Sequence, residues 1–411
     1  MPIENVAITG VGVVSSLGTD FDEFDRKLAE AHVAVTAAPW AGDEGLEYAW
    51  VSLVKDFEPK DWMSDRVIEG SDPFTWYAMA AAMQAVESSG LTELDPRRTA
   101  VIVGTALAGA ESFAESQHGL DTIGPDGADR KLQIQAWPNM AASQIVMHYG
   151  LHGPSLTLST ACASAHDAIG TAARMIEAGM VDVAITGASD RTRTKLQILT
   201  MGKYGMFAQQ PDPYKACLPF DVNRTGVMPA EGAGMLVLER ADRARARGAT
   251  IHARIRGYAS MADGYHPSSP EPDGKWEQVA MEEALADAAL PGGADEIDAL
   301  MAHGTGTTVG DTAETRAINR LFAGRETPLP VASVKGHLGH TAGAAGIMSL
   351  YGGLASMKAN AVIPNAGTKE VDPEVEFHAV INEPHETKVD TVQVNAFGFG
   401  GQNASMIVTR E

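Results

Sequence analysis

Cys162 lies where a short apolar run ends and a helix is expected to begin at about Ser164. The unpaired N–H groups and the dipole of a helix N-terminus favour a thiolate over a thiol, and the same N–H groups can hold an oxyanion. One interpretation of Cys162 is therefore a nucleophile. The other is a buried and unreactive cysteine, which is common for a lone Cys. Cys217, which precedes Leu-Pro in a loop-like stretch, is interpreted as structural.

Two histidines, His303 and His340, follow predicted strands in polar, glycine-rich turns. Loops that follow strands are where α/β proteins place their chemistry. A neutral imidazole can donate its N–H to a developing oxyanion or enolate, and the nearby Lys335 could fix charge or tautomer beside it. Either histidine alone could be incidental, but together with Cys162 they favour a catalytic site.

Motifs for other ligands are incomplete. Gly10-Val-Gly12-Val-Val-Ser15 follows a strand as a dinucleotide-binding loop does, but serine replaces the third glycine. Gly304-Thr-Gly306-Thr lacks the Gly-Lys-Ser/Thr of a P-loop. Metal-type cysteine spacing is missing, and His337 with His340 makes a weak pair for zinc. We therefore expect neither a nucleotide nor a metal.

The elements that must position these residues alternate between strands and helices. Apolar runs ending in glycine predict buried strands in the first part of the chain, at Asn5–Gly10, Ala100–Gly104 and Val181–Gly187. Alanine-rich stretches with helical spacing lie between them, at Trp76–Ser89 and Ala165–Ala178. This alternation predicts an α/β sheet.

The second half of the chain repeats this pattern. Its expected strands are Ile251–Gly257, Ile297–Ala302, Leu329–Ala332 and Val392–Asn395, and its expected helices are Lys275–Ala289 and Thr341–Lys358. The prediction is two halves, residues 1–248 and 249–411. The junction lies in the charged stretch Glu239–Gly248, interpreted as a solvated helix rather than a basic binding patch because acids are interleaved.

Composition narrows the class of partner. The chain has 411 residues and a net charge of −22, so broad attraction to nucleic acid or to an anionic membrane surface is not expected. The most apolar long stretch, Ala342–Met357, is broken by glycines and serines and is too short to span a bilayer. Two cysteines cannot form a disulfide framework, and the N-terminus carries no secretory signal, so a cytoplasmic setting is expected.

Taken in order along the chain, these segments closely resemble the β-ketoacyl-acyl-carrier-protein synthases, the elongating, decarboxylative condensing enzymes of the thiolase superfamily. The shared motifs are Val6-Ala-Ile-Thr-Gly-Val-Gly-Val-Val-Ser, Thr160-Ala-Cys-Ala-Ser-Ala, Glu231-Gly-Ala-Gly-Met, Ala302-His-Gly-Thr-Gly-Thr, Lys335-Gly-His-Leu-Gly-His and Asn395-Ala-Phe-Gly-Phe-Gly-Gly. The resemblance implies a five-layered αβαβα thiolase-like fold made from two pseudo-repeated halves. It also implies a dimer in which the acyl pocket reaches toward the partner subunit.

The resemblance assigns roles to individual residues. It implies that Cys162 accepts the acyl chain as a thioester, with the amides of Cys162 and Phe399 as the oxyanion hole. His303 and His340 would stabilise the enolate formed as malonyl thioester loses CO₂, and its attack on the acyl-Cys gives a β-ketoacyl product. The other roles are polar support for Lys335 and Glu314, pantetheine contact for Thr305 and Thr307, and the acyl pocket for Leu107, Met201 and Phe399. From the residues alone, Glu314 and Asp311 could instead be helix-start acids favoured by the dipole.

Several positions depart from the common pattern of this family. Gln402 stands where threonine is usual, Ala106 and Ala108 replace glycines beside Leu107, and Met201 replaces an aromatic pocket residue. The stretch Thr225–Glu231 also differs from the usual Asp-Gly-Phe-Val-x-Gly-Glu. The sequence therefore does not determine which length of acyl chain the pocket prefers. These departures suggest a specialised polyketide or polyene pathway as well as ordinary fatty-acid synthesis.

The expected partner is an acidic acyl carrier protein, which brings both substrates on phosphopantetheine, so no further cofactor is expected. Its docking surface would be basic, because charge complementarity sets encounter and orientation. The segment Met63–Asp72 carries three acids where the family is often basic, so the docking surface must come from other residues. The expected docking residues are Arg130, Lys131 and Lys203, and further basic residues are Arg191, Arg193 and Lys195. The dimer could be a homodimer or a heterodimer with a ketosynthase-like chain-length subunit.

Four alternatives share parts of this pattern. A thiolase would need a second cysteine in the C-terminal loop, and Asn395-Ala-Phe-Gly-Phe-Gly contains none. Initiating condensing enzymes pair one histidine with an asparagine, whereas the Lys335-Gly-His-Leu-Gly-His motif supplies a second histidine. A non-catalytic chain-length subunit usually lacks the nucleophile, and a cysteine hydrolase would need a base positioned for water.

Overall fold

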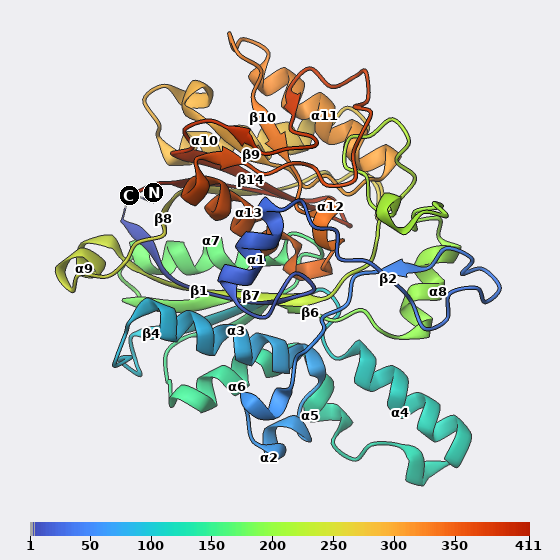
Figure 1. Ribbon diagram of the computed structural model, residues 1–411. Coiled ribbons are helices and arrows are strands. Elements are labelled where there is room, and N and C mark those ends of the chain that lie inside the picture. The colour runs from blue at the N-terminus through green and yellow to red at the C-terminus, as the bar shows by residue number, and fades with distance from the viewer. Residues whose placement is uncertain (1–2, 4) are drawn as a thin grey trace.

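Two mixed β-sheets form the centre of the computed structural model, which describes residue 3 and residues 5–411 (Figure 1). The first sheet has the strand order β5-β4-β6-β7-β1, and the second has the order β10-β9-β14-β15-β8. The strands of the first sheet are β1 (Val6–Ser15), β4 (Thr99–Gly104), β5 (Ser155–Leu158), β6 (Val183–Asp190) and β7 (Gly232–Arg240). Those of the second are β8 (Ala253–Ala262), β9 (Ala299–Met301), β10 (Pro330–Ala332), β14 (Thr391–Gly398) and β15 (Gln402–Thr409).

The two sheets repeat one topology. Numbered within its own half, each sheet has the order third, second, fourth, fifth, first. The first strands of the two halves, β1 and β8, also pair with each other at Val6↔Ile255 and the next two positions. Hydrogen bonding therefore runs through eleven strands, to the extra edge strand β12 (His378–Ala379).

Helices separate and cover the sheets. The helices α7 (Ser164–Glu177) and α13 (Ala345–Ala359) lie between the two sheets in Figure 1, whereas α3 (Pro73–Ser89) and α6 (Met140–Tyr149) cover the outer face of the first. The outer face of the second sheet is covered by α10 (Lys275–Ala288) and α11 (Thr308–Phe322). The five-layered αβαβα thiolase-like fold is confirmed.

The remaining elements are shorter or peripheral. The helices are α1 (Phe21–Ala29), α2 (Asp65–Ile68), α4 (Ala110–Ile123), α5 (Leu132–Ala136), α8 (Lys195–Lys203), α9 (Ala241–Ala246) and α12 (Lys335–Leu338). The two-residue strands are β2 (Thr36–Ala37), β3 (Trp50–Val51), β11 (Ala361–Val362) and β13 (His385–Glu386). Within the described part of the chain, no helix combines the length and the apolar character needed to cross a membrane.

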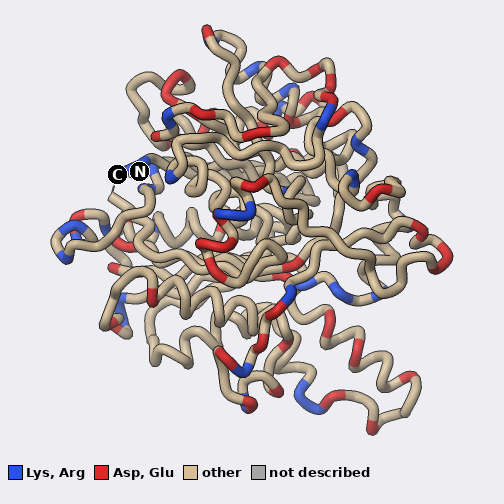
Figure 2. Tube along the Cα trace, viewed as in Figure 1, with Lys and Arg blue, Asp and Glu red and all other residues tan. Residues whose placement is uncertain are grey.

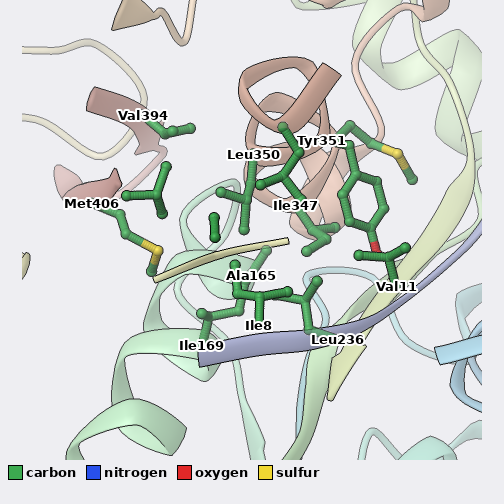
Figure 3. Close-up of a cluster of buried hydrophobic side chains, with 14 of the residues drawn as sticks. Ile8, Val11, Ala165, Ile169, Leu236, Ile347, Leu350, Tyr351, Val394 and Met406 are labelled. Carbon is green, nitrogen blue, oxygen red and sulfur yellow. The ribbon is translucent and has the colours of Figure 1, made fainter. Parts of the chain in front are cut away.

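The core between the sheets is built from apolar side chains of both halves. Figure 3 shows Ile8 and Leu236 of the first sheet facing Ile347 and Leu350 of α13. In the same layer the hydroxyl of Tyr351 donates to the carbonyl oxygens of Gly12 and Met235, both at 2.8 Å, which satisfies the polar end of a buried ring. This packing fixes α13, and therefore the loop before it that carries His340.

The glycine pair in β1 has a packing role. A Cβ on Gly10 would lie 2.0 Å from the carbonyl oxygen of Ala85, and one on Gly12 would lie 2.1 Å from that of Ala81. Both glycines are needed because α3 lies directly on the strand. This contact explains why the first part of a dinucleotide motif occurs here without the rest.

The charged junction differs from the prediction. The helix α9 is shorter than Glu239–Gly248, since β7 continues through Glu239 and Arg240. Glu239 is fully buried and forms an ion pair with Arg247 at 2.5 Å. The alternating acidic and basic residues of Glu239–Gly248 therefore include one buried ion pair, Glu239 with Arg247, as well as a solvated helix.

Candidate active site

Cys162 lies in a tight turn between β5 and α7. The residue before it, Ala161, has φ +51°, a left-handed conformation that costs about 1–3 kcal/mol for a residue other than glycine. Hydrogen bonds around the turn hold this conformation: the hydroxyl of Ser164 donates to the oxygen of Ala161 at 2.6 Å and accepts from the amide of Thr160 at 2.9 Å. The strained turn projects Cys162 into the cavity that contains the histidines.

The β14–β15 hairpin packs directly on this turn. A Cβ on Gly398 would lie 2.9 Å from the amide nitrogen of Cys162 and 3.0 Å from the oxygen of Thr160. Burial raises the pKa of the Cys162 thiol, and the backbone amides of Phe399 and Cys162 act in the opposite direction. These are the two amides expected to form an oxyanion hole.

The resting state of Cys162 differs from the expected thiolate. Burial raises the pKa of the Cys162 thiol to about 11, although Lys335 and the amide of Phe399 act in the opposite direction. The helix α7 begins at Ser164, two residues after Cys162. Removal of the Cys162 thiol from water therefore affects its pKa more than the N-terminus of this helix does. Cys162 is therefore a thiol near neutral pH and must lose its proton before or during any reaction in which its sulfur is the nucleophile.

The three reactive side chains come together across the two halves. The sulfur of Cys162 and one ring nitrogen each of His303 and His340 lie within 4.8 Å of one another. The two imidazole rings meet edge to face, with centroids 5.5 Å apart. His303 and His340 lie 141 and 178 positions after Cys162 in the chain, so residues of both halves meet at one point.

Both histidines are neutral and present the same nitrogen to the cavity. The Nδ1 atom of His340 accepts from the amide of Ala342 at 3.0 Å, so in the neutral ring the proton is on Nε2. The Nδ1 atom of His303 faces the ammonium of Lys335 at 3.4 Å, which favours the same tautomer. Burial lowers the pKa of His340 to about 3 and that of His303 well below its usual value, with a further lowering by Lys335 in both cases. Two Nε2–H donors result.

Lys335 is buried directly behind His303. Its ammonium also donates to the carbonyl oxygen of His303 in a short hydrogen bond. Burial lowers the pKa of Lys335, while Glu314 and Cys162 raise it. The positive charge is thus held beside the histidines by neighbouring acids.

Glu314 and Asp311 hold the backbone of the loop that carries His303. The two carboxylate oxygens of Glu314 accept from the amides of His303 and Gly304, at 2.8 and 2.7 Å. Asp311 accepts from the amides of Thr305 at 2.9 Å and Gly306 at 3.0 Å. Both acids act on the loop rather than through the helix dipole alone.

One cavity of about 590 Å³ contains the site. Its lining includes Cys162, His303 and His340, together with the expected pantetheine contacts Thr305 and Thr307 and the expected pocket residues Leu107, Met201 and Phe399. Leu107 and Met201 lie on an apolar wall with Met206 and Val227. Other lining residues are polar, and this polar wall includes Glu277 of α10, Asp311 and Glu314 of α11, Asp263 and Asn403.

The basic residues expected to dock a carrier do not form one patch. Arg191 and Arg193 are wrong as docking residues, because both pair with the fully buried carboxylate of Glu231. Lys195 pairs with Asp43 at 2.5 Å, and Lys131 lies 3.4 Å from Glu69. Lys203 ends α8 beside Tyr204, which lines the cavity.

Figure 2 shows why a basic patch is difficult to assemble. Lysine and arginine are scattered among more numerous acids over the described surface. Arg130 and Lys131 lie in the segment between α4 and α5, and Lys203 lies on α8. Arg130 and Lys203 are exposed and Lys131 is half-buried, and the pair Arg130–Lys131 lies on a different element from Lys203.

Sequence reasoning missed Asp190, which connects the apolar wall to the His340 loop. Its buried carboxylate accepts from the amides of Leu107 at 2.9 Å and Gly343 at 2.6 Å, and from the hydroxyl of Thr105. A charged residue that ends the buried run Val183–Asp190 was the available signal. His337, by contrast, lies away from the cavity, with Nε2 at 2.7 Å from the oxygen of Pro364.

Comparison with known proteins gives consistent matches over the chain. The family models for the beta-ketoacyl synthase N-terminal and C-terminal domains match residues 3–244 and 252–369. A 3-oxoacyl-[acyl-carrier-protein] synthase 2 of Coxiella burnetii is 32% identical and covers 100% of this chain and 99% of its own.

Two solved structures are similar over their full length. The ishigamide ketosynthase/chain length factor matches with a TM-score of 0.92 and 31% identity, covering 99% of both chains. A type II polyketide synthase acyl-carrier protein in complex with its ketosynthase, bound to the hexaketide, matches with a TM-score of 0.91 and 26% identity, covering 100% of both chains.

Proposed function

The chain belongs to the β-ketoacyl synthase family and is an acyl-transferring condensing enzyme, and from its geometry we propose how its residues divide the work. The reaction is decarboxylative condensation of a Cys-bound acyl chain with malonyl-acyl carrier protein, which gives a β-ketoacyl-carrier product. One observation carries the assignment: a thiol and one ring nitrogen from each of two neutral histidines lie within 4.8 Å of one another in one cavity.

In the first step Cys162 takes the acyl group from its carrier. The sulfur forms a bond to the acyl carbon, the carrier's C–S bond breaks, and the thiol proton passes to the departing thiolate. The developing oxyanion is held by the amides of Cys162 and Phe399. Because burial raises the pKa of Cys162, deprotonation is coupled to attack rather than completed beforehand.

In the second step His303 and His340 donate Nε2–H to the thioester oxygen of the malonyl group. The bond to the carboxylate breaks, CO₂ leaves, and the electron pair becomes the enolate that the two donors stabilise. Its carbon attacks the acyl-Cys carbonyl and expels the Cys162 thiolate, which regains a proton because its pKa is near 11. Lys335 and Glu314 act on the ring and backbone of His303.

The proposal also covers the carrier protein that delivers the substrates and the pathway to which they belong. We assign an acyl carrier protein as the partner, with Thr305 and Thr307 contacting its phosphopantetheine arm, and Arg130, Lys131 and Lys203 as its docking residues. A fatty-acid substrate and a polyketide or polyene substrate both fit an apolar wall formed by Leu107 and Met201. The likeness to a polyketide ketosynthase bound to its carrier supports the carrier assignment.

A dimer completes the proposal. Strand β5 ends the sheet and leaves its outer edge without a strand partner in the described chain, a position where unpaired backbone groups invite a second chain. Leu156 of this strand is exposed, as are Phe113, Ile134 and Trp137 of the same half. The partner is a second copy or a chain-length-type subunit, and the likeness to a ketosynthase/chain length factor supports considering both. The boundary between the halves is placed at residues 248 and 249, after α9.

Intact-mass analysis tests this function. The protein is incubated with acyl carrier proteins of different chain length, with and without the Cys162→Ala substitution, and then given malonyl carrier. An acyl adduct confined to the unsubstituted protein, followed by CO₂ release and a product two carbons longer, is expected. Acylation at another residue, or malonyl consumption without chain extension, would contradict it.

Cys162→Ala also separates the two steps. The histidine donors remain in this variant, so malonyl carrier is still decarboxylated while no condensed product forms. A thiolase is not favoured, because the described cavity contains no second cysteine in the hairpin loop, and a chain-length subunit is not favoured, because Cys162 is present.

A further inference from the structure

Glu277 is a buried carboxyl group on the polar wall of the cavity that the mechanism above does not use. It lies in the first turn of α10, is 2% exposed and lines the same cavity as Cys162. Its Oε2 atom is buried without a hydrogen-bond partner among the described residues. A buried carboxyl oxygen without a partner is costly and rare in native structures, so a ligand that supplies the partner is the economical explanation.

The other acids on this wall are already occupied. Asp311 and Glu314 accept from backbone amides of the His303 loop, and Asp263 accepts from the amide of Glu271 at 3.0 Å and from the side chain of Asn403. Glu277 is the remaining carboxyl of the described wall with a polar atom free for a ligand.

The cavity has two chemically different walls that suit the two parts of a carrier-borne substrate. Leu107, Met201 and Met206 on one side suit a hydrocarbon chain. On the other side, Asp311 holds Thr305, whose hydroxyl is 2.8 Å from that of Thr307. Glu277 belongs to this second side, because Asp311 and Glu314 are among its close charged neighbours.

We propose that Glu277 is a substrate-binding residue that hydrogen-bonds an amide of the phosphopantetheine arm. The inference rests on the function proposed above and extends it by one residue. A carboxylic acid and an amide are complementary, since the acid O–H can donate to an amide oxygen, or the acid carbonyl can accept from an amide N–H.

The surroundings of Glu277 keep it in the form that this pairing needs. Burial raises its pKa well above the usual value, and Glu314, Asp263, Glu271 and Asp311 raise it further. Glu277 is therefore a neutral acid whose O–H can donate a hydrogen bond. It does not need a charged group on the ligand as its partner.

Malonyl thioesters of three thiols test the proposal, with CO₂ release as the readout. Pantetheine carries two amides, N-acetylcysteamine carries one, and butanethiol carries none. In Glu277→Leu, we expect KM for malonyl-pantetheine to rise about tenfold, the value of one hydrogen bond, with kcat unchanged. KM for malonyl-butanethiol should not change.

Two further variants keep the test independent of folding. Glu277→Gln keeps a donor and an acceptor at the same position and should retain KM for malonyl-pantetheine near the original value. Glu283→Gln and Glu283→Leu place the same changes at an exposed position of the same helix and should have no effect. Circular dichroism and melting temperature establish that each variant is folded.

A pH series adds a readout that a structural role would not produce. KM for malonyl-pantetheine should rise with pH in the original protein as Glu277 loses its proton, and should stay level in Glu277→Gln. Equal KM changes for all three thioesters would overturn the proposal. A KM change that does not depend on the number of amides in the thiol, and so arises at the malonyl group, would also overturn it. The proposed function fails separately, through absence of Cys162 acylation and of CO₂ release in the original protein.

Discussion

The ammonium of Lys335 lies 3.4 Å from Nδ1 of His303 and also donates to the carbonyl oxygen of that residue. One side chain therefore sets both the tautomer and the position of a histidine that comes from another loop. The charge also lowers the pKa of His303 and of His340, which keeps both rings neutral. Lys335 is best understood as a positioning residue for two donors.

Lys335→Met should therefore slow decarboxylation more than acylation. The tautomer of His303 is no longer set, and one donor to the enolate is lost, which costs about 100-fold in rate. CO₂ release from malonyl carrier measures this step, and the rate of acyl adduct formation at Cys162 serves as the comparison. An equal loss in both steps would show that Lys335 acts mainly on the nucleophile.

Gly398→Ala should disable acylation. The added methyl group would meet the amide nitrogen of Cys162 at 2.9 Å and must displace the hairpin that carries the Phe399 amide. Loss of one oxyanion donor predicts an acylation rate reduced by about 100-fold, measured by intact mass. Gly324→Ala is the matched control, because nothing lies within 4 Å of the added group. Unchanged acylation in Gly398→Ala would contradict the assigned oxyanion hole.

Glu314→Gln should lower both stability and activity. Each carboxylate oxygen of Glu314 accepts from a backbone amide, and Gln would direct an NH₂ group at one of those donors. A cost of about 1–3 kcal/mol in the free energy of unfolding is expected. Urea denaturation measures it, with Glu283→Gln as an exposed comparison. A full loss of activity with no change in stability would instead indicate direct contact with substrate.

Stability should fall as the pH is lowered from about 6.5. The pKa of His340 is lowered to about 3, and those of His166 and His337 are lowered to about 4, in each case mainly by burial. Above pH 6.5 these groups are neutral in both the folded and unfolded states, so their contribution is complete. Between pH 6.5 and the folded values only the unfolded chain binds protons, and stability decreases.

Melting temperature measured from pH 8 to pH 4 checks this sign. His337→Gln should flatten the decline, because one group that resists protonation is removed. His118→Gln, at an exposed position, is the control. The raised pKa of buried acids such as Glu277 acts in the opposite direction, so the comparison between the two proteins is the test. An equal pH dependence in His337→Gln and the original protein would contradict burial of a neutral His337.

Leu156→Glu should interfere with assembly at the β5 edge. A charge on this exposed position of the edge strand opposes pairing with a second chain. Light scattering should report a dimer for the original protein, alone or with a chain-length-type subunit, and a smaller species for the variant. A monomeric original protein that is fully active would contradict the dimer.

Sequence reasoning predicted the α/β class, which the structure confirms, and selected Cys162, His303 and His340, which the structure places in one cavity, for physical reasons that are local. Strand ends, glycine-rich turns and helix starts are encoded within a few residues, so Cys162, His303 and His340 could each be recognised in its own segment. The repeat of strands and helices predicted two α/β halves, and the resemblance to the family implied the layered fold. The order of motifs along the chain identified the family.

Only the tertiary structure could decide which charges are free and how the reactive groups are protonated. Arg193 resembles a surface cation in the sequence, yet it pairs with Glu231, which lies 38 residues further along the chain. Cys162 is expected to be a thiolate from its helix, yet enclosure by both halves raises its pKa. Burial and ion pairing depend on residues from distant segments, because they are properties of packing. The local sequence determined the identity of the proposed catalytic groups, and the packing of the two halves determined their protonation states and their partners.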